Sequence, residues 1–364
     1  MNSNTLKAFL AAACAALTLG FPDLASASDA PAPTAPTHKE YPTIGSIERL
    51  APELDRLIAP DAKIQKLAGG FAWAEGPVWN RKTGTLLFSD VPRNVVFEWK
   101  AGVGTRDYLY PSGYTQAHRR EGNDREQGSN GLTFDAEGRL VLCQHGDRRV
   151  ARFEPGKGFE TLAQYYLNRR FNSPNDLVYD AKGNLYFTDP TYGLPRDPAN
   201  PEKLLGQELL LSGVYLLRPN GEVVLVVKDL TFPNGVALSP LGKLLYVAVS
   251  DPENPRIMSY PVKPDGTLDA GTVFFDAKPL MAQGKGLPDG LKVDKAGNLF
   301  ATGPGGVLVI SPLGKLLGLI NPGETTANCA WGDDGTILYM TADTILCRIK
   351  TKTQGTGDWP KLKP

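Results

Sequence analysis

A short phrase that recurs six times along the chain constrains the fold more than any other feature. In each copy an acidic or amide residue is followed five positions later by Asn, Asp or Ser, and a glycine comes two to four positions after that. The copies begin at Glu75, Asn130, Asn175, Asn234, Asp289 and Asn328. A repeated phrase of this kind is typical of repeat architectures, in which each copy is one supersecondary unit.

Each copy predicts a β-hairpin. A short apolar strand ends at a turn whose Asx or Ser and Gly residues tolerate left-handed backbone angles, and a β-rich run such as Leu86–Phe88 or Leu185–Phe187 follows. The copies begin 39 to 59 residues apart, close to the period of about 40 to 50 residues of four-stranded propeller blades. Propellers have four to eight blades, so the sequence predicts an all-β, six-bladed β-propeller.

Helix signals are sparse, and the ends of the repeat indicate how the ring closes. We expect one short helix at Pro52–Ile58, and no strand–helix alternation that would favour an α/β fold. The β-rich run Ile64–Ala68 precedes the first copy, and Ile345–Ile349 ends the last one. We expect the first run to be the outer strand of the last blade, beside the second.

The N-terminus has the pattern of an export signal. Lys7 precedes an apolar stretch of small residues, and Ala25-Ser-Ala27 resembles a cleavage site. The stretch is shorter than the roughly 20 residues that span a bilayer, so we expect cleavage, release to the periplasm or the medium, and no transmembrane span in the mature chain. Lipid attachment at Cys14 is the alternative.

The predicted organisation is a signal peptide at 1–27, an Ala/Pro-rich linker at 28–43, the propeller at 44–352 and a C-terminal tail at 353–364. Lys+Arg and Asp+Glu balance at 39 each, so no basic field favours nucleic acid as a partner. Without the signal, three cysteines remain, Cys143, Cys329 and Cys347. We expect them to be buried small apolar residues; a Cys329–Cys347 bridge is left open.

The repeat also predicts a metal site. Equivalent positions of six blades lie at equivalent heights, so the first residues of the six phrases would bring two carboxylates and four amides to the mouth of the central channel. Buried polar groups are costly without partners, and such an oxygen set suits a divalent ion, with calcium expected first. The lack of nitrogen and sulfur donors argues against zinc as the preferred metal; magnesium, manganese and zinc stay open.

Six motifs carry a resemblance to a known family. They are Ala74-Glu-Gly-Pro77, Ser129-Asn-Gly-Leu132, Asn172-Ser-Pro-Asn-Asp176, Thr188-Asp-Pro-Thr-Tyr-Gly193, Phe232-Pro-Asn-Gly235 and Leu287-Pro-Asp-Gly290. With them the chain resembles the regucalcin and gluconolactonase family of calcium-dependent six-bladed propellers, its bacterial gluconolactonase branch above all, with paraoxonase as a more distant relative. The resemblance runs from about Leu54 to Lys350.

The resemblance implies roles for particular residues. It implies metal ligation by Glu75, Asn175, Asn234 and Asp289, with Asp176 as a secondary candidate, and a substrate pocket near Asn130 and His145. Paraoxonase-like sites have two histidines in this region, whereas this chain has His145 alone, so a His–His relay is excluded.

The expected activity is hydrolysis of a small sugar lactone such as gluconolactone. The metal would polarise the carbonyl, Asp289 is the candidate base with metal-bound water as the alternative, and Asn130 or Asn175 would hydrogen-bond the oxyanion. His145 and Tyr192 are the other substrate-binding candidates. Arg148 and Arg149 would orient substrate or form a solvated edge.

Several alternatives stay open. Asp189 and Tyr192 also fit a capped turn with a packed aromatic ring. Another lactone, an ester or a phosphotriester is the alternative substrate, and a ligand-binding propeller without activity is the alternative function. No G-x-S-x-G elbow supports a serine hydrolase.

Overall fold

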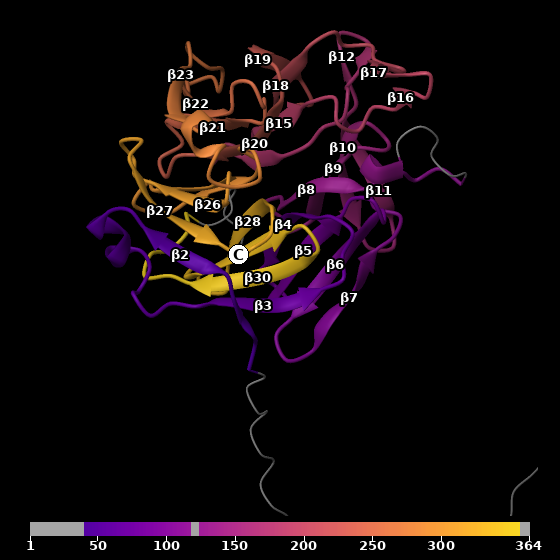
Figure 1. Cartoon of the computed structure of the whole chain (residues 1–364). Helices are drawn as coiled ribbons and strands as arrows, with labels where there is room; N and C mark the ends of the chain where they lie inside the picture. Colours follow the sequence, from indigo (N-terminus) through magenta and orange to yellow (C-terminus); the bar gives the residue numbers. More distant parts are fainter. Residues whose placement is uncertain (1–39, 118–123, 357–364) are drawn as a thin grey trace, which may run out of the picture. The chain divides into compact units, whose positions relative to one another are not determined.

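Six antiparallel sheets follow one another along the chain and form the blades of a ring (Figure 1). The computed structural model describes residues 40–117 and 124–356. The predicted signal peptide, Cys14, most of the linker and the end of the tail lie outside these residues.

Four blades are built from consecutive stretches of the chain. Blade 1 contains β4 (Ala74–Asn80), β5 (Thr85–Asp90), β6 (Val95–Lys100) and β7 (Gly104–Leu109). Blade 2 contains β8 (Ser129–Phe134), β9 (Leu140–Gln144), β10 (Arg149–Glu154) and β11 (Gly158–Ala163). Blade 3 contains β14 (Leu177–Tyr179), β15 (Leu185–Asp189), β18 (Ser212–Leu217) and β19 (Val223–Leu230), and blade 4 contains β20 (Pro233–Leu238), β21 (Leu244–Val249), β22 (Arg256–Pro261) and β23 (Thr272–Asp276).

The other two blades take strands from both ends of the described chain. Blade 5 contains β24 (Leu291–Val293), β25 (Leu299–Gly303), β26 (Gly306–Ile310), β27 (Leu316–Asn321) and the early strand β2 (Ser46–Arg49). Blade 6 contains β28 (Thr326–Gly332), β29 (Ile337–Ala342), β30 (Ile345–Lys350), β3 (Ile64–Gly69) and β1 (Thr43–Ile44). Two small hairpins lie outside the blades, β12 (Tyr165–Tyr166) with β13 (Arg169–Arg170) and β16 (Arg196–Asp197) with β17 (Asn200–Leu204).

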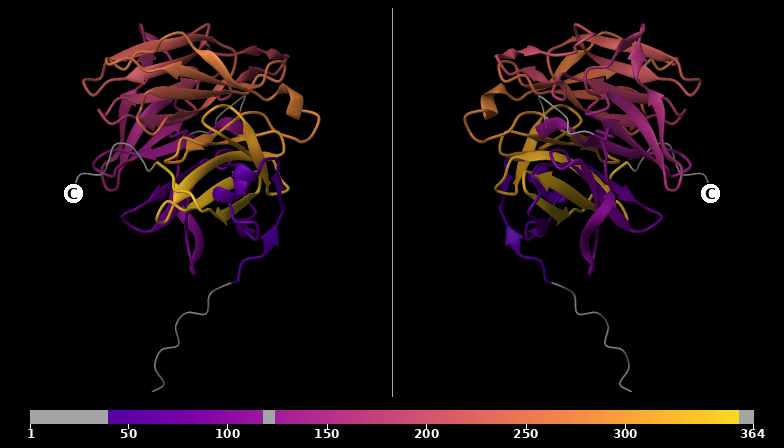
Figure 2. Two further views of the ribbon diagram at one scale, coloured as in Figure 1. Left: turned by 90° about the vertical axis from the view of Figure 1, so that its left-hand side faces the viewer. Right: turned by 90° about the vertical axis from the view of Figure 1, so that its right-hand side faces the viewer.

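The predicted closure of the ring is confirmed. Ile64 pairs with Ile349 and Gly69 with Ile345, so β3 is the fourth strand of blade 6. Figure 2 shows these N-terminal strands, in indigo, beside the yellow C-terminal ones from two sides. The pairings of β2 and β1 were not anticipated, and β1 falls partly in the predicted linker.

In residues 40–117 and 124–356, three short 3-10 helices account for the helical residues. The predicted helix is confirmed as η1 (Pro52–Arg56), and Leu54 and Ile58 are buried against blades 5 and 6. The other two are η2 (Asp124–Glu126) and η3 (Lys278–Leu280). Within the described ranges, no helix is long and apolar enough to cross a membrane.

The hairpin interpretation of the repeat is confirmed by backbone geometry. All six turn glycines have positive φ, at Gly84, Gly138, Gly183, Gly242, Gly297 and Gly335. That conformation costs a residue with a Cβ roughly 1–2 kcal/mol, which explains why each turn has glycine.

The hydrophobic core lies between neighbouring blades. The structure has a buried apolar cluster for each adjacent pair, from Val78 and Leu132 between blades 1 and 2 to Trp79 and Tyr339 between blades 6 and 1. The central strands of the blades are therefore buried on both faces. The innermost strands contact one another around the ring, β28 with β4 included.

The central channel is narrow and mostly apolar along the middle of the innermost strands. A cavity of about 60 Å³ on the axis is lined by all six innermost strands. Thr356 lines it too, and its backbone N–H donates to the Val293 carbonyl oxygen at 3.1 Å. The first residues of the six phrases lie at or just before the beginnings of these strands.

Candidate active site

The first residues of the phrases lie where neighbouring innermost strands come closest. A Cβ on Gly76 would be 2.0 Å from the carbonyl oxygen of Asn130, and one on Gly235 would be 2.1 Å from that of Asp289. Gly131 stands in the same relation to Asn175, at 2.6 Å. Glycine at the second position therefore allows the polar residue of the next blade to approach.

Two phrases have another residue in place of this glycine. Blade 6 has Cys329, and blade 3 has Asp176, which is 3% exposed. The Asp176 carboxylate accepts hydrogen bonds from the backbone N–H of Leu177 at 2.8 Å and of Val236, in blade 4, at 3.4 Å. Asp176 thus adds a third carboxylate near the axis and links two blades.

The first residues of the six phrases form a polar ring (hereafter the ring), and hydroxyl groups of second strands donate to two of its backbone carbonyls. Ser89 Oγ donates to the Asn130 carbonyl oxygen at 2.8 Å, and Thr188 Oγ1 donates to that of Asn234 at 2.7 Å. Because these two carbonyls are satisfied, the side-chain oxygens of Asn130 and Asn234 are the groups left for a ligand on the axis.

Two asparagine side chains are anchored through their nitrogens. Asn234 Nδ2 donates to Ser250 Oγ at 3.0 Å, and Asn175 Nδ2 lies 3.4 Å from His145 Nε2. An amide held at its nitrogen presents its oxygen on the other side of the group. Asn175 and Asn234 therefore have oxygens available as ligands.

Asn328 is arranged differently. Its Oδ1 accepts the backbone N–H of Cys329 at 2.8 Å, and its side chain hydrogen-bonds Glu75. The side-chain oxygen of Asn328 is therefore engaged, and the Asn328 side chain supports the Glu75 carboxylate.

The carboxylates of the ring are poorly compensated. Burial raises the pKa of Glu75 to about 8, with a further rise from the charge of Asp176. Burial, followed by the charges of Glu75 and Asp176, raises the pKa of Asp289 well above its usual value. No described ion pair involves these three side chains. Uncompensated carboxylates of this kind favour a bound cation.

The donor set fits a hard divalent cation. Calcium takes carboxylate and amide oxygens in flexible geometry, and Glu75, Asn175, Asn234 and Asp289 offer these groups. In the described part of the chain, no three His, Cys, Asp or Glu side chains form a ready-made metal cluster. A site here therefore depends on the amide oxygens as well.

His145 lies beside this group and is fully buried. Its Nδ1 is 3.0 Å from Oε2 of Glu126, while its Nε2 faces Asn175. Glu126 was missed in the sequence, because it lies in the insertion between blades 1 and 2, outside every repeated phrase. The spacing of 55 residues between the first two phrases was the one signal that an insertion was there.

Asp189 caps a turn, which is one of the two roles that the sequence left open for it. Its carboxylate accepts the backbone N–H groups of Asn172 and Ser173, both at 2.8 Å. Burial raises its pKa to about 7, against the lowering effect of these hydrogen bonds. Asp189 therefore holds the loop that leads into Asn175.

Tyr192 lies close to the ring. Its side chain stacks on Phe232 with ring centroids 5.9 Å apart, and burial raises the pKa of its hydroxyl, which the side chains of Ser250 and Asn234 partly offset. This contact with the residues around Asn234 brings Tyr192 to the same end of the channel; its role toward a substrate stays a prediction.

The two arginines are engaged with the protein. Arg148 is buried, and its guanidinium donates to the carbonyl oxygens of Phe171 and Gly206, both at 2.8 Å. The prediction of a solvated edge is therefore wrong for Arg148, because the loops around blade 3 cover it. Arg149 donates to Gln144 and pairs with Asp147.

The cysteine interpretation is confirmed. Cys143, Cys329 and Cys347 are free and buried, and burial raises the pKa of each thiol. No Cys329–Cys347 bridge forms.

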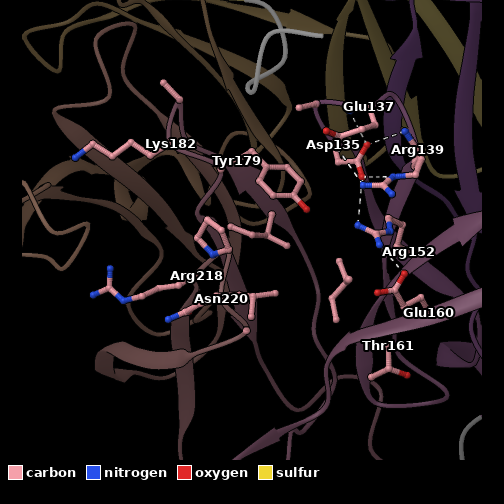
Figure 3. A pocket seen from close by; sticks show the side chains of 18 residues that line it. Asp135, Glu137, Arg139, Arg152, Glu160, Thr161, Tyr179, Lys182, Arg218 and Asn220 are labelled. Atoms are coloured by element: carbon pink, nitrogen blue, oxygen red, sulfur yellow. Dashed lines mark hydrogen bonds and ion pairs between the residues drawn. The ribbon is translucent and has the colours of Figure 1, made fainter. Parts of the chain in front are cut away.

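A large cavity of about 970 Å³ lies away from this ring, between blades 2 and 3 (Figure 3). It is lined by turns at the other end of the innermost strands, including Asp135–Arg139 and Tyr179–Gly183. The carboxylates that line it pair with arginines: Asp135 and Glu137 with Arg139, at 2.7 and 3.1 Å, and Glu160 with Arg152 at 2.5 Å. These pairs leave no group of uncompensated carboxylates, so the ring is the stronger candidate for catalysis.

Fold and site define a six-bladed propeller with buried carboxylate and amide oxygens at one end of its axis. The family model described as SMP-30/Gluconolactonase/LRE-like region matches residues 73–344. The chain belongs to this family.

Individual relatives agree with this assignment. The chain is 38% identical over 318 residues to a gluconolactonase of Zymomonas mobilis, across 86% of this chain and 88% of the relative. A solved gluconolactonase from Xanthomonas campestris superposes with a TM-score of 0.73 and 29% identity, across 86% of this chain and 98% of that one. The calcium-binding protein regucalcin from Agrobacterium tumefaciens, at 17% identity and a TM-score of 0.61, covers 82% of this chain and 98% of its own and shares the fold.

Proposed function

We propose that this protein is a metal-dependent hydrolase that opens a small sugar lactone such as gluconolactone. Lactone hydrolysis follows from the family and from the gluconolactonase relatives. Beyond that, we propose calcium as the metal, Glu75, Asn175, Asn234 and Asp289 as its ligands, and Asp289 as the base. The observation that carries the metal site is the pair of amides anchored at their nitrogens beside two carboxylates without a cationic partner, the buried Glu75 and the partly exposed Asp289.

A divalent cation bound by these oxygens would act as a Lewis acid on the lactone carbonyl. Asn130 is the better of the two candidates for hydrogen-bonding the oxyanion, because the nitrogen of Asn175 already faces His145. Such a donor contributes about 10²- to 10³-fold in kcat.

The partial exposure of Asp289 supports its proposed role as the base that acts on the attacking water. Asp289 is the one member of the ring that is partly exposed, whereas the other five are buried. Asp289 takes a proton as the water oxygen bonds to the carbonyl carbon. Cleavage of the lactone C–O bond then releases the lactone oxygen, which receives that proton and becomes a hydroxyl group. The product is the open hydroxy acid. His145 and Tyr192, which flank the ring, would contact the sugar.

The test is acid release from gluconolactone, followed by a pH indicator against the spontaneous rate. The chelator-treated chain should lose the enzymatic rate and recover it with calcium. Magnesium, manganese and zinc are added in parallel to identify the working ion, and a panel of aryl lactones, acyl lactones and phosphotriesters identifies the substrate class. Full activity in the chelator would refute metal dependence, and no activity on any lactone would favour a binding protein.

We also propose that the chain is exported, on the pattern of residues 1–27. Cell fractionation with N-terminal sequencing should find the protein outside the cytoplasm and beginning near Ser28. An intact cytoplasmic N-terminus would contradict export.

A further inference from the structure

We propose that Glu126 is a positioning residue for the metal site, acting through His145 on the amide of Asn175. This inference depends on the proposed metal site and adds to it a residue outside the repeated phrases. Three side chains are connected by two contacts: Glu126 Oε2 is 3.0 Å from His145 Nδ1, and His145 Nε2 is 3.4 Å from Asn175 Nδ2.

The direction of the hydrogen bonds follows from the first group. A carboxylate only accepts hydrogen bonds, so it places the imidazole proton on Nδ1, and Nε2 of the neutral ring is then an acceptor. The group of Asn175 that matches an acceptor is its NH₂. The Asn175 oxygen is thereby turned away from His145 and left for the axis.

A second relay in the same ring has the same logic. Ser250 Oγ donates to the carbonyl oxygen of Pro288 at 2.5 Å, which makes it an acceptor for Asn234 Nδ2 at 3.0 Å. Both proposed amide ligands are thus oriented by a group whose own hydrogen bond is fixed. One relay ends on a backbone carbonyl, and the other ends on the Glu126 side chain.

Burial makes the first relay effective. His145 is fully buried, and its two ring nitrogens face Glu126 and Asn175, so the imidazole is held in one orientation. Outer partners that orient a metal ligand typically contribute about 10- to 100-fold to metal affinity. We expect an effect of this size from Glu126.

The experiment is a calcium titration of the chelator-stripped, full-length chain by calorimetry at fixed pH. Glu126→Ala should weaken calcium binding about 10- to 100-fold. In His145→Gln, the new side-chain oxygen can accept from Asn175 directly, so the calcium affinity should stay within about 3-fold of wild type. Adding Glu126→Ala to His145→Gln should then change the calcium affinity little, because residues of one network have non-additive effects. Glu160→Ala, which removes an exposed carboxylate of blade 2, is the charge control and should leave affinity unchanged.

The double-mutant design separates orientation from charge. An equal loss from Glu126→Ala in both backgrounds would mean that Glu126 acts by its charge alone, and no loss in either would remove it from the site; each result overturns the inference. Should Glu126→Ala fail to fold, Glu126→Gln is compared in the two backgrounds, with a loss expected only beside His145. A wild-type chain that binds no calcium would refute the proposed metal site, and this inference with it.

Discussion

The close approach of blades 4 and 5 gives a sharp prediction for Gly235→Ala. The new Cβ would lie 2.1 Å from the Asp289 carbonyl oxygen, and Cβ atoms essentially never come within 3.0 Å of such an atom. The strands must therefore separate by about 0.9 Å, which moves Asp289 away from Asn234. A misplacement of about 1 Å costs about 10²-fold in rate, and overpacking of this kind costs about 1–3 kcal/mol of stability.

The assay is kcat on gluconolactone together with the calcium Kd and the thermal midpoint. Gly242→Ala is the matched control, seven positions along the same hairpin. Its φ of +64° makes alanine strained, at roughly 1–2 kcal/mol, but nothing lies within 4 Å of the new Cβ. We expect this control to lose stability and keep kcat and calcium affinity. Wild-type kcat and Kd in Gly235→Ala would refute the idea that the blade contact sets the site geometry.

Three further predictions concern the carboxylates. Asp289→Asn should abolish turnover and retain part of the calcium affinity, measured by calorimetry; unchanged kcat would remove Asp289 from the mechanism. The pKa of Glu75 is raised from 4.5 to about 8 in the fold, so without metal its protonation stabilises the fold below about pH 4.5, and this contribution is lost as pH rises through about 8. The melting temperature measured in chelator should therefore fall between these two pH values. Glu75→Gln should make the melting temperature depend less on pH over the same range. Asp189→Asn turns a donor toward the N–H of Asn172 or Ser173, so it should cost about 1–3 kcal/mol in denaturant unfolding; an unchanged midpoint would contradict its capping role.

The fold could be predicted because its constraints are local. Each hairpin needs a glycine with positive φ at its turn, and six such turns at blade-like intervals identify a propeller. The closing strand was predictable from order and composition, because Ile64–Ala68 is a β-rich run before the first phrase and the last blade needed a fourth strand. The pairing of β2 with blade 5 was not, because nothing in Ser46–Arg49 encodes a partner some 270 residues away.

The ring of polar residues was predictable from the register of the repeat, but the differences among its members were not. Asn175, Asn234 and Asn328 occupy equivalent positions, yet the first two are anchored at nitrogen and the third at oxygen. That difference depends on His145, Ser250 and the Cys329 backbone, which become neighbours only in the folded chain. Arg148 was misjudged for a similar reason, since the loops that bury it lie far along the sequence.

The most direct test of the metal site is a crystal structure of the calcium-loaded protein. The account predicts one ion at the channel mouth, about 2.3–2.6 Å from oxygens of Glu75, Asn175, Asn234 and Asp289. An active enzyme with its ion elsewhere, or with no ion, would contradict it.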